Sequence, residues 1–322
     1  MGEWKLPPDG GHMDRDTGLY FQNMTGKQVS ERLKENDILL IPVGSTENHG
    51  AAAPYGEDTF LVTRMAEMVA QKTGCTIAQP IWYGSHPAMH LGMPGTVVVH
   101  EDVFVAYLRN VIAGFWNAGF RKQIFLNGHG QEYVIPTALH QFMKKYQVPS
   151  VLMMLNWPTV IPQYLKDKEC GGPFETPFRH ADEAETSYSM ALFPELVKLE
   201  DAVDNNPSSS IPRGHIDMGG DVYQYPFPGH CVIGFGGLEV ISFPEGVIGK
   251  PSLASAEKAK PGLEVLLDYM VEVIDMVKEK YPPGKLPPAE SITQRPHEEV
   301  EALLKGPLHR GGRNIYTVAY PP

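Results

Sequence analysis

The sequence predicts an α/β fold built around a mostly parallel sheet, because apolar strand-like runs alternate with helix-like segments. The clearest runs are 38–43, 122–126 and 150–155, short apolar stretches typical of strands that are buried on both faces. Strand–helix–strand units of this kind join parallel strands through right-handed crossovers. A chain of 322 residues is long enough for one large domain of this class or two smaller ones.

Helices are expected between and after these strands. Segment 101–119 has acidic residues in its first turn, apolar residues at helical spacing and Gly119 at its end, which together indicate a complete helix. Thr25 is a candidate cap for a short helix before the first strand. The expected helices span 27–34, 58–72, 101–119, 132–146, 180–192, 252 or 255 to 280, and 298–304, and further β segments are expected at 76–81 and 96–99.

Composition divides the chain into three parts. Residues 1–24 are rich in glycine, proline and aspartate and are expected to form an irregular arm. Residues 25–281 hold the predicted folded domain. Residues 282–322 are rich in proline and glycine and are interpreted as a tail that could reach a neighbouring subunit. Within the domain, 200–245 is loop-rich, and long segments of this kind are usually functional or interfacial.

Charge and cysteine content exclude several classes of protein. The net charge of −11 argues against nucleic acid or an anionic membrane as partner and favours a small neutral or cationic molecule. The three cysteines, Cys75, Cys170 and Cys231, are scattered, which argues against a disulfide framework and favours a cytoplasmic location. No signal-peptide core and no run of about 18 apolar residues is present, so no membrane association is expected.

The loop after the first strand carries the first candidate metal ligands. Glu47 and His49 are two residues apart, so on an extended backbone they point the same way. Asp58 follows where the next helix should begin. Imidazole and carboxylate suit zinc, manganese or iron. The alternative is a helix cap with two solvated polar residues.

Two further segments carry candidate site residues. His129 lies between two glycines in the loop after the predicted strand 122–126, and parallel strands would bring this loop to the edge that holds Glu47. The segment from His180 to Ser187 opens a helix with Glu183 and Glu185. Spacing does not choose between these two glutamates, and an acidic first turn is also favoured by the helix dipole alone.

These segments resemble the creatininase (creatinine amidohydrolase) family, and the resemblance covers residues 27–281. Met93–Thr96 is similar to the family's F-P-G-T segment, and 246–258 is similar to its closing G-x-x-G-x-P-x-x-A-[ST]-x-E-[KR] pattern. The other matching motifs are Glu47-x-His49, Asp58, Asn127–Gly130, and His180-Ala181-x-Glu183-x-Glu185-Thr186-Ser187.

The resemblance implies a three-layer α/β/α sandwich, a homo-oligomer that is commonly a hexamer, and two divalent metal ions, zinc with manganese or iron. Asp58 would be the ligand that bridges the two metals. His180 would act as acid/base or contact the substrate, and Glu185 would lie near the metals with a catalytic or ligating role. By motif, the metal ligands would be Glu47, His49, Asp58 and His129, with Glu185 completing the set.

Three departures from the family pattern concern the metals and the substrate. Gln131 stands where creatininase has a metal-binding glutamate, and Glu132 is one residue too late, so Glu185 could complete the second metal's ligands instead. Lys250 stands where the family usually has an acid. The loop 84–90 is one residue longer than the common pattern and is expected to line the substrate pocket. The predicted substrate-binding residues are His86, His90, Trp157 and Gln131.

The predicted reaction is attack of metal-bound hydroxide on a carbonyl of a small cyclic substrate. A cyclic amide opened at its C–N bond is the first expectation. A cyclic polyhydroxy diketone of the 3-dehydro-scyllo-inosose type, opened at a C–C bond, is the alternative. A second alternative, favoured by Gln131, is a non-catalytic protein that binds a metal or small molecule on the same fold.

Overall fold

The core of the protein is a four-stranded sheet in the order β2-β1-β3-β4, with every neighbouring pair parallel. The computed structural model describes residues 4–86, 92–205 and 245–318. They confirm the predicted mostly parallel α/β fold. The strands are β1 (Ile38–Val43), β2 (Thr76–Ile77), β3 (Lys122–Asn127) and β4 (Val151–Asn156).

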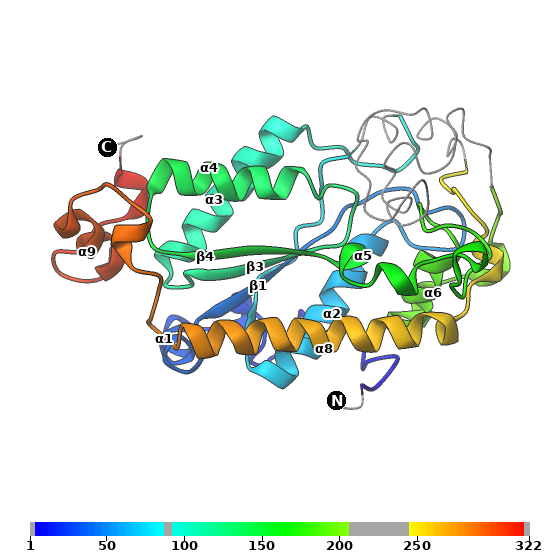
Figure 1. Cartoon of the computed structure of the whole chain (residues 1–322), viewed down its shortest axis with the longest axis horizontal. Coiled ribbons are helices and arrows are strands. Elements are labelled where there is room, and N and C mark those ends of the chain that lie inside the picture. Colours follow the sequence, from blue (N-terminus) through cyan, green and yellow to red (C-terminus); the bar gives the residue numbers. More distant parts are fainter. Residues whose placement is uncertain (1–3, 87–91, 206–244, 319–322) are drawn as a thin grey trace.

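Helices cover both faces of the sheet, as a three-layer sandwich requires (Figure 1). Because side chains alternate along β1, Ile38 and Leu40 enter one apolar cluster while Leu39 and Ile41 enter the other. The first cluster lies under α2 (Glu57–Thr73), α6 (Glu183–Leu192) and α8 (Ala256–Lys280), and the second under α3 (Glu101–Asn117) and α4 (Val134–Tyr146).

Local sequence explains some of the helix ends. Thr25 caps α1 (Gly26–Glu35) in a capping box with Gln28, and Gly74 ends α2 with a positive φ of 71°. The described residues also form α5 (Trp157–Val160) and α9 (His297–Lys305). Short 3-10 helices span Phe21–Asn23, Pro162–Tyr164, Lys168–Cys170, Pro194–Leu196, Leu199–Asp201, Pro251–Leu253, Ala289–Ser291 and Ile315–Thr317.

Two predicted β segments are wrong in extent or kind. The strand expected at 76–81 ends at Ile77, and Ile81 forms only an isolated bridge with Val43. The segment expected at 96–99 is not a strand. Its amides instead bond two neighbouring loops. Val97 N donates to Thr46 O at 2.9 Å, and Val99 N donates to Gly84 O at 3.0 Å.

The segment before α1 is irregular but firmly packed. Trp4, Leu19 and Tyr20 are buried in the first apolar cluster. The Tyr20 hydroxyl donates to Glu67 Oε1 at 2.8 Å, and the His12 amide donates to the same oxygen at 2.7 Å. The described part of the arm, from residue 4, therefore belongs to the folded body.

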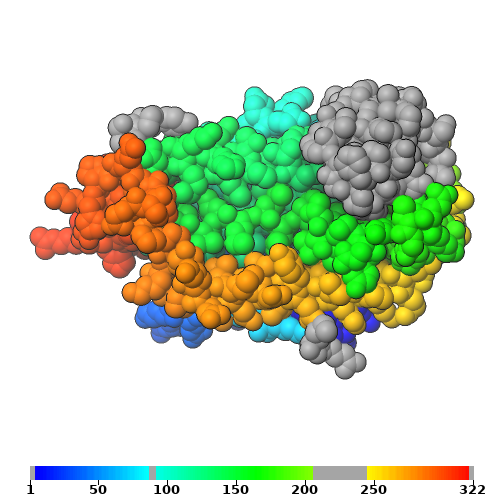
Figure 2. Space-filling model, viewed as in Figure 1, coloured from blue at the N-terminus to red at the C-terminus, as the bar shows by residue number. Residues whose placement is uncertain are grey.

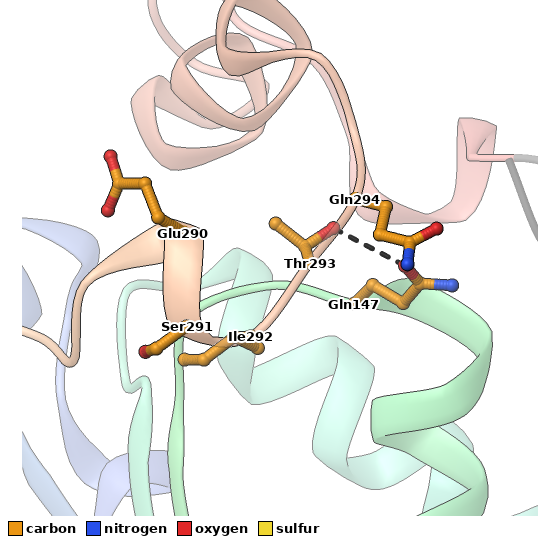
Figure 3. Close-up of a pocket in the computed structure, with 6 residues that line it drawn as sticks. All are labelled: Gln147, Glu290, Ser291, Ile292, Thr293 and Gln294. Atoms are coloured by element: carbon orange, nitrogen blue, oxygen red, sulfur yellow. Dashed lines mark hydrogen bonds between the residues drawn. The ribbon is translucent and has the colours of Figure 1, made fainter.

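The segment after α8 also packs on the chain's own domain. Leu303, Ile315 and Val318 are buried in the second apolar cluster, and the segment gathers at one end of the molecule (Figure 2). A shallow pocket lies between it and the end of α4, where Thr293 Oγ1 donates to Gln147 Oε1 at 3.4 Å (Figure 3). Contact of this tail with a neighbouring subunit stays a prediction.

No helix within the described residues is both long enough and apolar enough to cross a membrane. Cys75 and Cys170 are free thiols, and Cys231 lies outside the described residues.

A buried ion pair fastens the chain after α8 to the sheet. Lys122 Nζ lies 2.6 Å from Asp37 Oδ1 and donates to the carbonyls of Tyr281 and Pro282, and Asp37 Oδ2 accepts from the Gly284 amide. Removing one partner leaves a buried charge uncompensated.

We expect Asp37→Ala to lower the free energy of unfolding by about 3 kcal/mol, the lower end of the range for broken buried pairs because two carbonyls still hold Lys122. Urea denaturation measures the loss. Asp16→Ala, at an exposed aspartate, is the control and should change stability by less than about 0.5 kcal/mol. Equal stability of the two variants would contradict this account of the ion pair.

Candidate metal centre

Side chains from five separate segments meet at the carboxyl end of the sheet. The loop after β1 carries Glu47 and His49, and the first turn of α2 carries Glu57 and Asp58. Figure 1 shows α5 and α6 at this end of the sheet and α9 at the opposite end. The remaining members are His86, His129 after β3, His180, and Glu185 in the first turn of α6.

Glu47 lies at the centre of this cluster. Its Oε1 lies 3.4 Å from one nitrogen each of His49, His129 and His180, and its Oε2 lies 2.9 Å from His86 Nδ1. The four imidazoles form two tilted ring pairs, His49 with His180 and His86 with His129. Glu47 therefore connects every imidazole of the cluster.

Asp58 offers one carboxylate oxygen to each half of the cluster. Its Oδ1 lies 3.5 Å from His49 Nε2, and its Oδ2 lies 3.0 Å from His129 Nδ1. The Ser45 hydroxyl donates to Oδ2 at 2.7 Å and fixes the orientation of the carboxylate. This geometry suits the bridging role that the family resemblance implies for Asp58.

Two further carboxylates approach His49. Glu57 Oε2 lies 3.5 Å and Glu185 Oε2 lies 3.8 Å from His49 Nε2. Glu185 also accepts from the Ala181 amide at 2.6 Å, and Glu57 Oε1 accepts from the Ser189 hydroxyl. His49, Glu57 and Glu185 are each at least nine-tenths buried.

The pKa values of these groups are governed by their mutual proximity. Burial lowers the pKa of His49, but Asp58, Glu57 and Glu47 outweigh it and raise the value to about 10. Burial, reinforced by neighbouring carboxylates, raises the pKa of Glu57 and of Glu185 well above the ordinary range. For Asp58, burial and Glu47 act to raise the pKa, but His129 and His49 outweigh them and lower it.

The donor set fits divalent metal ions. His49 Nε2 and Glu57 Oε2 are buried and make no hydrogen bond to any described residue, and such atoms are costly to bury without a partner. Ligand atoms lie within 4.8 Å of one another in three overlapping groups: Glu47, His86 and His129; Glu47, His49 and His180; and His49, Glu57, Asp58 and Glu185. Imidazoles mixed with carboxylates are typical ligands of zinc, manganese and iron.

Close backbone contacts hold the loops of the cluster together. A Cβ on Gly128 would lie 2.3 Å from Asp58 O, so only glycine lets the loop after β3 approach α2 this closely. Gly246 has φ of 72°, and a Cβ there would lie 2.4 Å from Asn48 Oδ1. The glycine pattern at 246–249 thus serves to press this segment onto the loop that carries Glu47 and His49.

The structure distinguishes Glu183 from Glu185, between which residue spacing could not choose. Glu185 faces His49, whereas Glu183 accepts from the Glu175 amide at 2.6 Å and pairs with Lys258. Lys258, the last residue of the closing pattern and part of the first turn of α8, is therefore the partner of a buried carboxylate outside the ligand groups.

His180 lies inside the cluster and faces a backbone carbonyl. Its Nε2 is 2.8 Å from Asn48 O, which can only accept a hydrogen bond, so Nε2 carries the proton and Nδ1 faces Glu47. The acid/base role expected of His180 stays a prediction.

The predicted substrate-binding residues fall in different places. His86 lies with Glu47 and His129 as a potential ligand. Trp157 is buried in the first apolar cluster, 5.4 Å from Phe178 and 4.9 Å from Tyr188 between ring centroids. His90 lies outside the described residues. Substrate contacts by these residues stay predictions.

Gln131 ties two loops together. Its Oε1 accepts from the Ser85 amide at 3.0 Å, and its Nε2 donates to Gly44 O at 3.1 Å. Glu132 is half-buried and lies outside the three ligand groups found among the described residues. Replacement of the missing family glutamate by Glu132 therefore has no support from the ligand groups, and a role of Gln131 in the site stays a prediction.

We expect Gln131→Glu to destabilise the protein by about 1–3 kcal/mol, because a carboxylate oxygen would face Gly44 O where an amide now donates. Thermal unfolding measures the change. Gln141→Glu is the matched control, since Gln141 Oε1 only accepts from Arg109 and a carboxylate preserves that contact. Stability equal to that of the unmodified protein would show that the Gly44 contact is unimportant.

Sequence reasoning did not single out Glu57 as a site residue. The sequence offered one indication of its role, since Glu57 directly precedes the predicted ligand Asp58. Acidic residues in a first helical turn are common for dipole reasons alone, so only the fold shows that Glu57 points at His49.

Comparisons with known proteins give a consistent result. The family model described as creatininase, creatinine amidohydrolase, matches residues 22–274. The chain is 60% identical over 305 residues to 3-dehydro-scyllo-inosose hydrolase of Thermotoga maritima, which covers 95% of this chain and 98% of that protein. It is 25% identical over 282 residues to creatinine amidohydrolase of Pseudomonas putida, covering 82% and 98%. Among solved structures, "Creatininase Mn" aligns with a TM-score of 0.64 at 22% identity, covering 82% of this chain and 99% of that one.

Proposed function

Since the chain belongs to the creatininase family of hydrolases, we propose that it is a metal-dependent hydrolase that opens a cyclic polyhydroxy diketone of the 3-dehydro-scyllo-inosose type at a C–C bond. The observation that carries the substrate proposal is the 60% identity to 3-dehydro-scyllo-inosose hydrolase over 95% of the chain. The cyclic amide expected first from the sequence has weaker support, because the similarity to creatinine amidohydrolase is 25%. The comparisons thus favour the C–C alternative.

The proposed metal ligands are Glu47, His49, Asp58, His129 and Glu185, which the fold brings together. Two divalent ions, zinc with manganese or iron, suit this mixture of imidazole and carboxylate. When bound, such ions lower the pKa of water and polarise a carbonyl. Glu47 and Asp58 face the same nitrogen of His49, Nε2, so these carboxylates would share an ion with that imidazole.

The proposed reaction needs only water as a second reactant. Its oxygen adds to one carbonyl carbon, and the bond from that carbon to the neighbouring ring carbon breaks. In a diketone whose two carbonyls flank that ring carbon, the bonding electron pair is stabilised by the second carbonyl as an enolate. A proton then reaches the enolate carbon, and the products are one carboxylate and one ketone on an opened chain. His180, whose Nδ1 faces Glu47 in the cluster, is proposed to deliver this proton.

The rival proposal of a non-catalytic binding protein loses its main support. Gln131 suggested an incomplete metal site, but Glu57, Glu185 and His86 add donors to the cluster. A cytoplasmic homo-oligomer, a hexamer by family resemblance, remains part of the proposal, and light scattering on the purified protein would give the subunit number.

Profiling the purified, metal-loaded protein tests the proposed reaction. We expect kcat/KM for 3-dehydro-scyllo-inosose to exceed that for creatinine and for simple lactams by about 10³-fold or more. Product carboxylate, followed by NMR, should carry one oxygen from labelled water. Faster turnover of the amides would favour the first expectation, and indifference to both classes by protein that holds two metals would defeat the proposal.

A further inference from the structure

Glu57 occupies a position that an orienting residue would not take. A carboxylate that only orients a metal-binding histidine bonds the ring nitrogen that faces away from the metal. In His49 that nitrogen is Nδ1, which lies 3.3 Å from Glu47 O. Glu57 instead faces Nε2, the same nitrogen that Asp58 and Glu185 face.

Four carboxylates surround His49 Nε2 at similar distances, as ligands around a shared ion would. They lie 3.4–3.8 Å from this nitrogen, and it makes no hydrogen bond to any of them. Glu57 Oε2 is also buried without a hydrogen bond to a described residue. One nitrogen can bond only one partner, so a cation between His49 and the carboxylates explains the arrangement better than hydrogen bonding does.

The position that creatininase fills with a glutamate is not available here. Both ends of the Gln131 amide are engaged, with Ser85 N and Gly44 O. Glu57 reaches the cluster from a different element, the first turn of α2, and its other oxygen is held by the Ser189 hydroxyl of α6. The carboxylate is thus fixed between two helices and aimed into the cluster.

We propose that Glu57 is a direct ligand of one of the two divalent ions, together with His49, Asp58 and Glu185, in place of the glutamate that Gln131 replaces. This inference rests on the proposed function, because it presumes a metal-loaded site. The group has one imidazole and three carboxylates, whereas the group of Glu47, His86 and His129 has two imidazoles. Carboxylates suit manganese and imidazole suits zinc. The affinity for manganese relative to zinc is therefore higher at the Glu57 position than at the other position.

The test is the number and affinity of bound metal ions in Glu57→Gln. Protein is stripped with a chelator and titrated with MnCl₂, and bound manganese is followed by electron paramagnetic resonance and by elemental analysis. We expect one of two sites to lose affinity by about 100-fold or more, beyond the 10–100-fold typical of residues that only orient a ligand. The other site keeps its affinity.

Glu67→Gln is the matched control, since Glu67 is a buried glutamate of the same helix outside the cluster. It should retain both sites. Glu57→Asp keeps a carboxylate on a shorter side chain, and it replaces Glu57→Gln if that variant does not fold by circular dichroism. The Asp variant should also lose affinity at one site.

Two unchanged sites in Glu57→Gln or Glu57→Asp would overturn the ligand assignment while leaving the proposed hydrolase intact. Unmodified protein that binds fewer than one metal per chain, and turns over no substrate, would instead overturn the proposed function. A ratio of zinc affinity to manganese affinity that is as high at the Glu57 site as at the other site would contradict the predicted metal preference.

Discussion

Glu47→Gln is expected to lower kcat/KM by about 10³-fold or more, the size of effect seen when a central electrostatic group of an active site is removed. Glu47 contacts all four imidazoles of the cluster. The amide would place an N–H₂ group against ring nitrogens and would remove one negative charge from the proposed metal ligands. Steady-state kinetics at saturating metal separates loss of chemistry from loss of metal.

The control for Glu47→Gln is Glu132→Gln, which tests whether Glu132 replaces the missing family glutamate. Because Glu132 lies outside the ligand groups of the described residues, its variant should keep activity within about twofold of the unmodified protein. Circular dichroism should show a native spectrum for both proteins. An active Glu47→Gln protein, or an inactive Glu132→Gln protein, would refute the arrangement described above.

Removal of the metals is expected to abolish turnover, and their rebinding is expected to release protons. At pH 7 His49 is protonated in the metal-free protein, because the surrounding carboxylates raise its pKa to about 10. A metal needs the neutral ring, so binding expels this proton. Apparent affinity should therefore rise with pH, about tenfold per unit for each proton released, and fall as the solution becomes more acidic.

Calorimetric titration of the stripped protein with MnCl₂, in two buffers of different ionisation enthalpy, counts the released protons. We expect at least one per chain between pH 6 and 8. Activity should return in parallel with bound metal. Affinity that is independent of pH in this range would contradict the charged state assigned to His49, and turnover by protein free of metal would contradict the proposed mechanism.

The sequence predicts the sheet and much of the site for the same physical reason. Parallel strands end at a common edge, so the loops after β1 and β3 must meet, and Glu47, His49 and His129 follow those strands directly. Asp58 could be added because a helix had to start nearby. This reasoning needs only strand order and chain direction.

Other features depend on contacts that no local pattern reveals. The orientation of Glu57 is set by the packing of α2 against α6, and the choice of Glu185 over Glu183 is set by Lys258 on α8. The extended pattern at 76–81 is interrupted because the chain advances four residues, from Ile77 to Ile81, beside three of β1, from Leu40 to Val43, and this extra residue breaks the regular pairing. The segments flanking the domain look irregular in sequence, yet Trp4 and Ile315 pack into its two apolar clusters.

The contact between Gly246 and Asn48 has a consequence for the order of events during synthesis. Val247 packs on Gly50, and Ile248 N donates to His180 O at 2.9 Å, so a segment made late in translation clamps loops made early. A nascent chain that has emerged only to residue 200 already contains every proposed ligand but not this clamp. Ligand loops without this clamp should hold ions less firmly, so we expect a chain truncated at residue 200 to bind metal more weakly than the chain that includes Gly246.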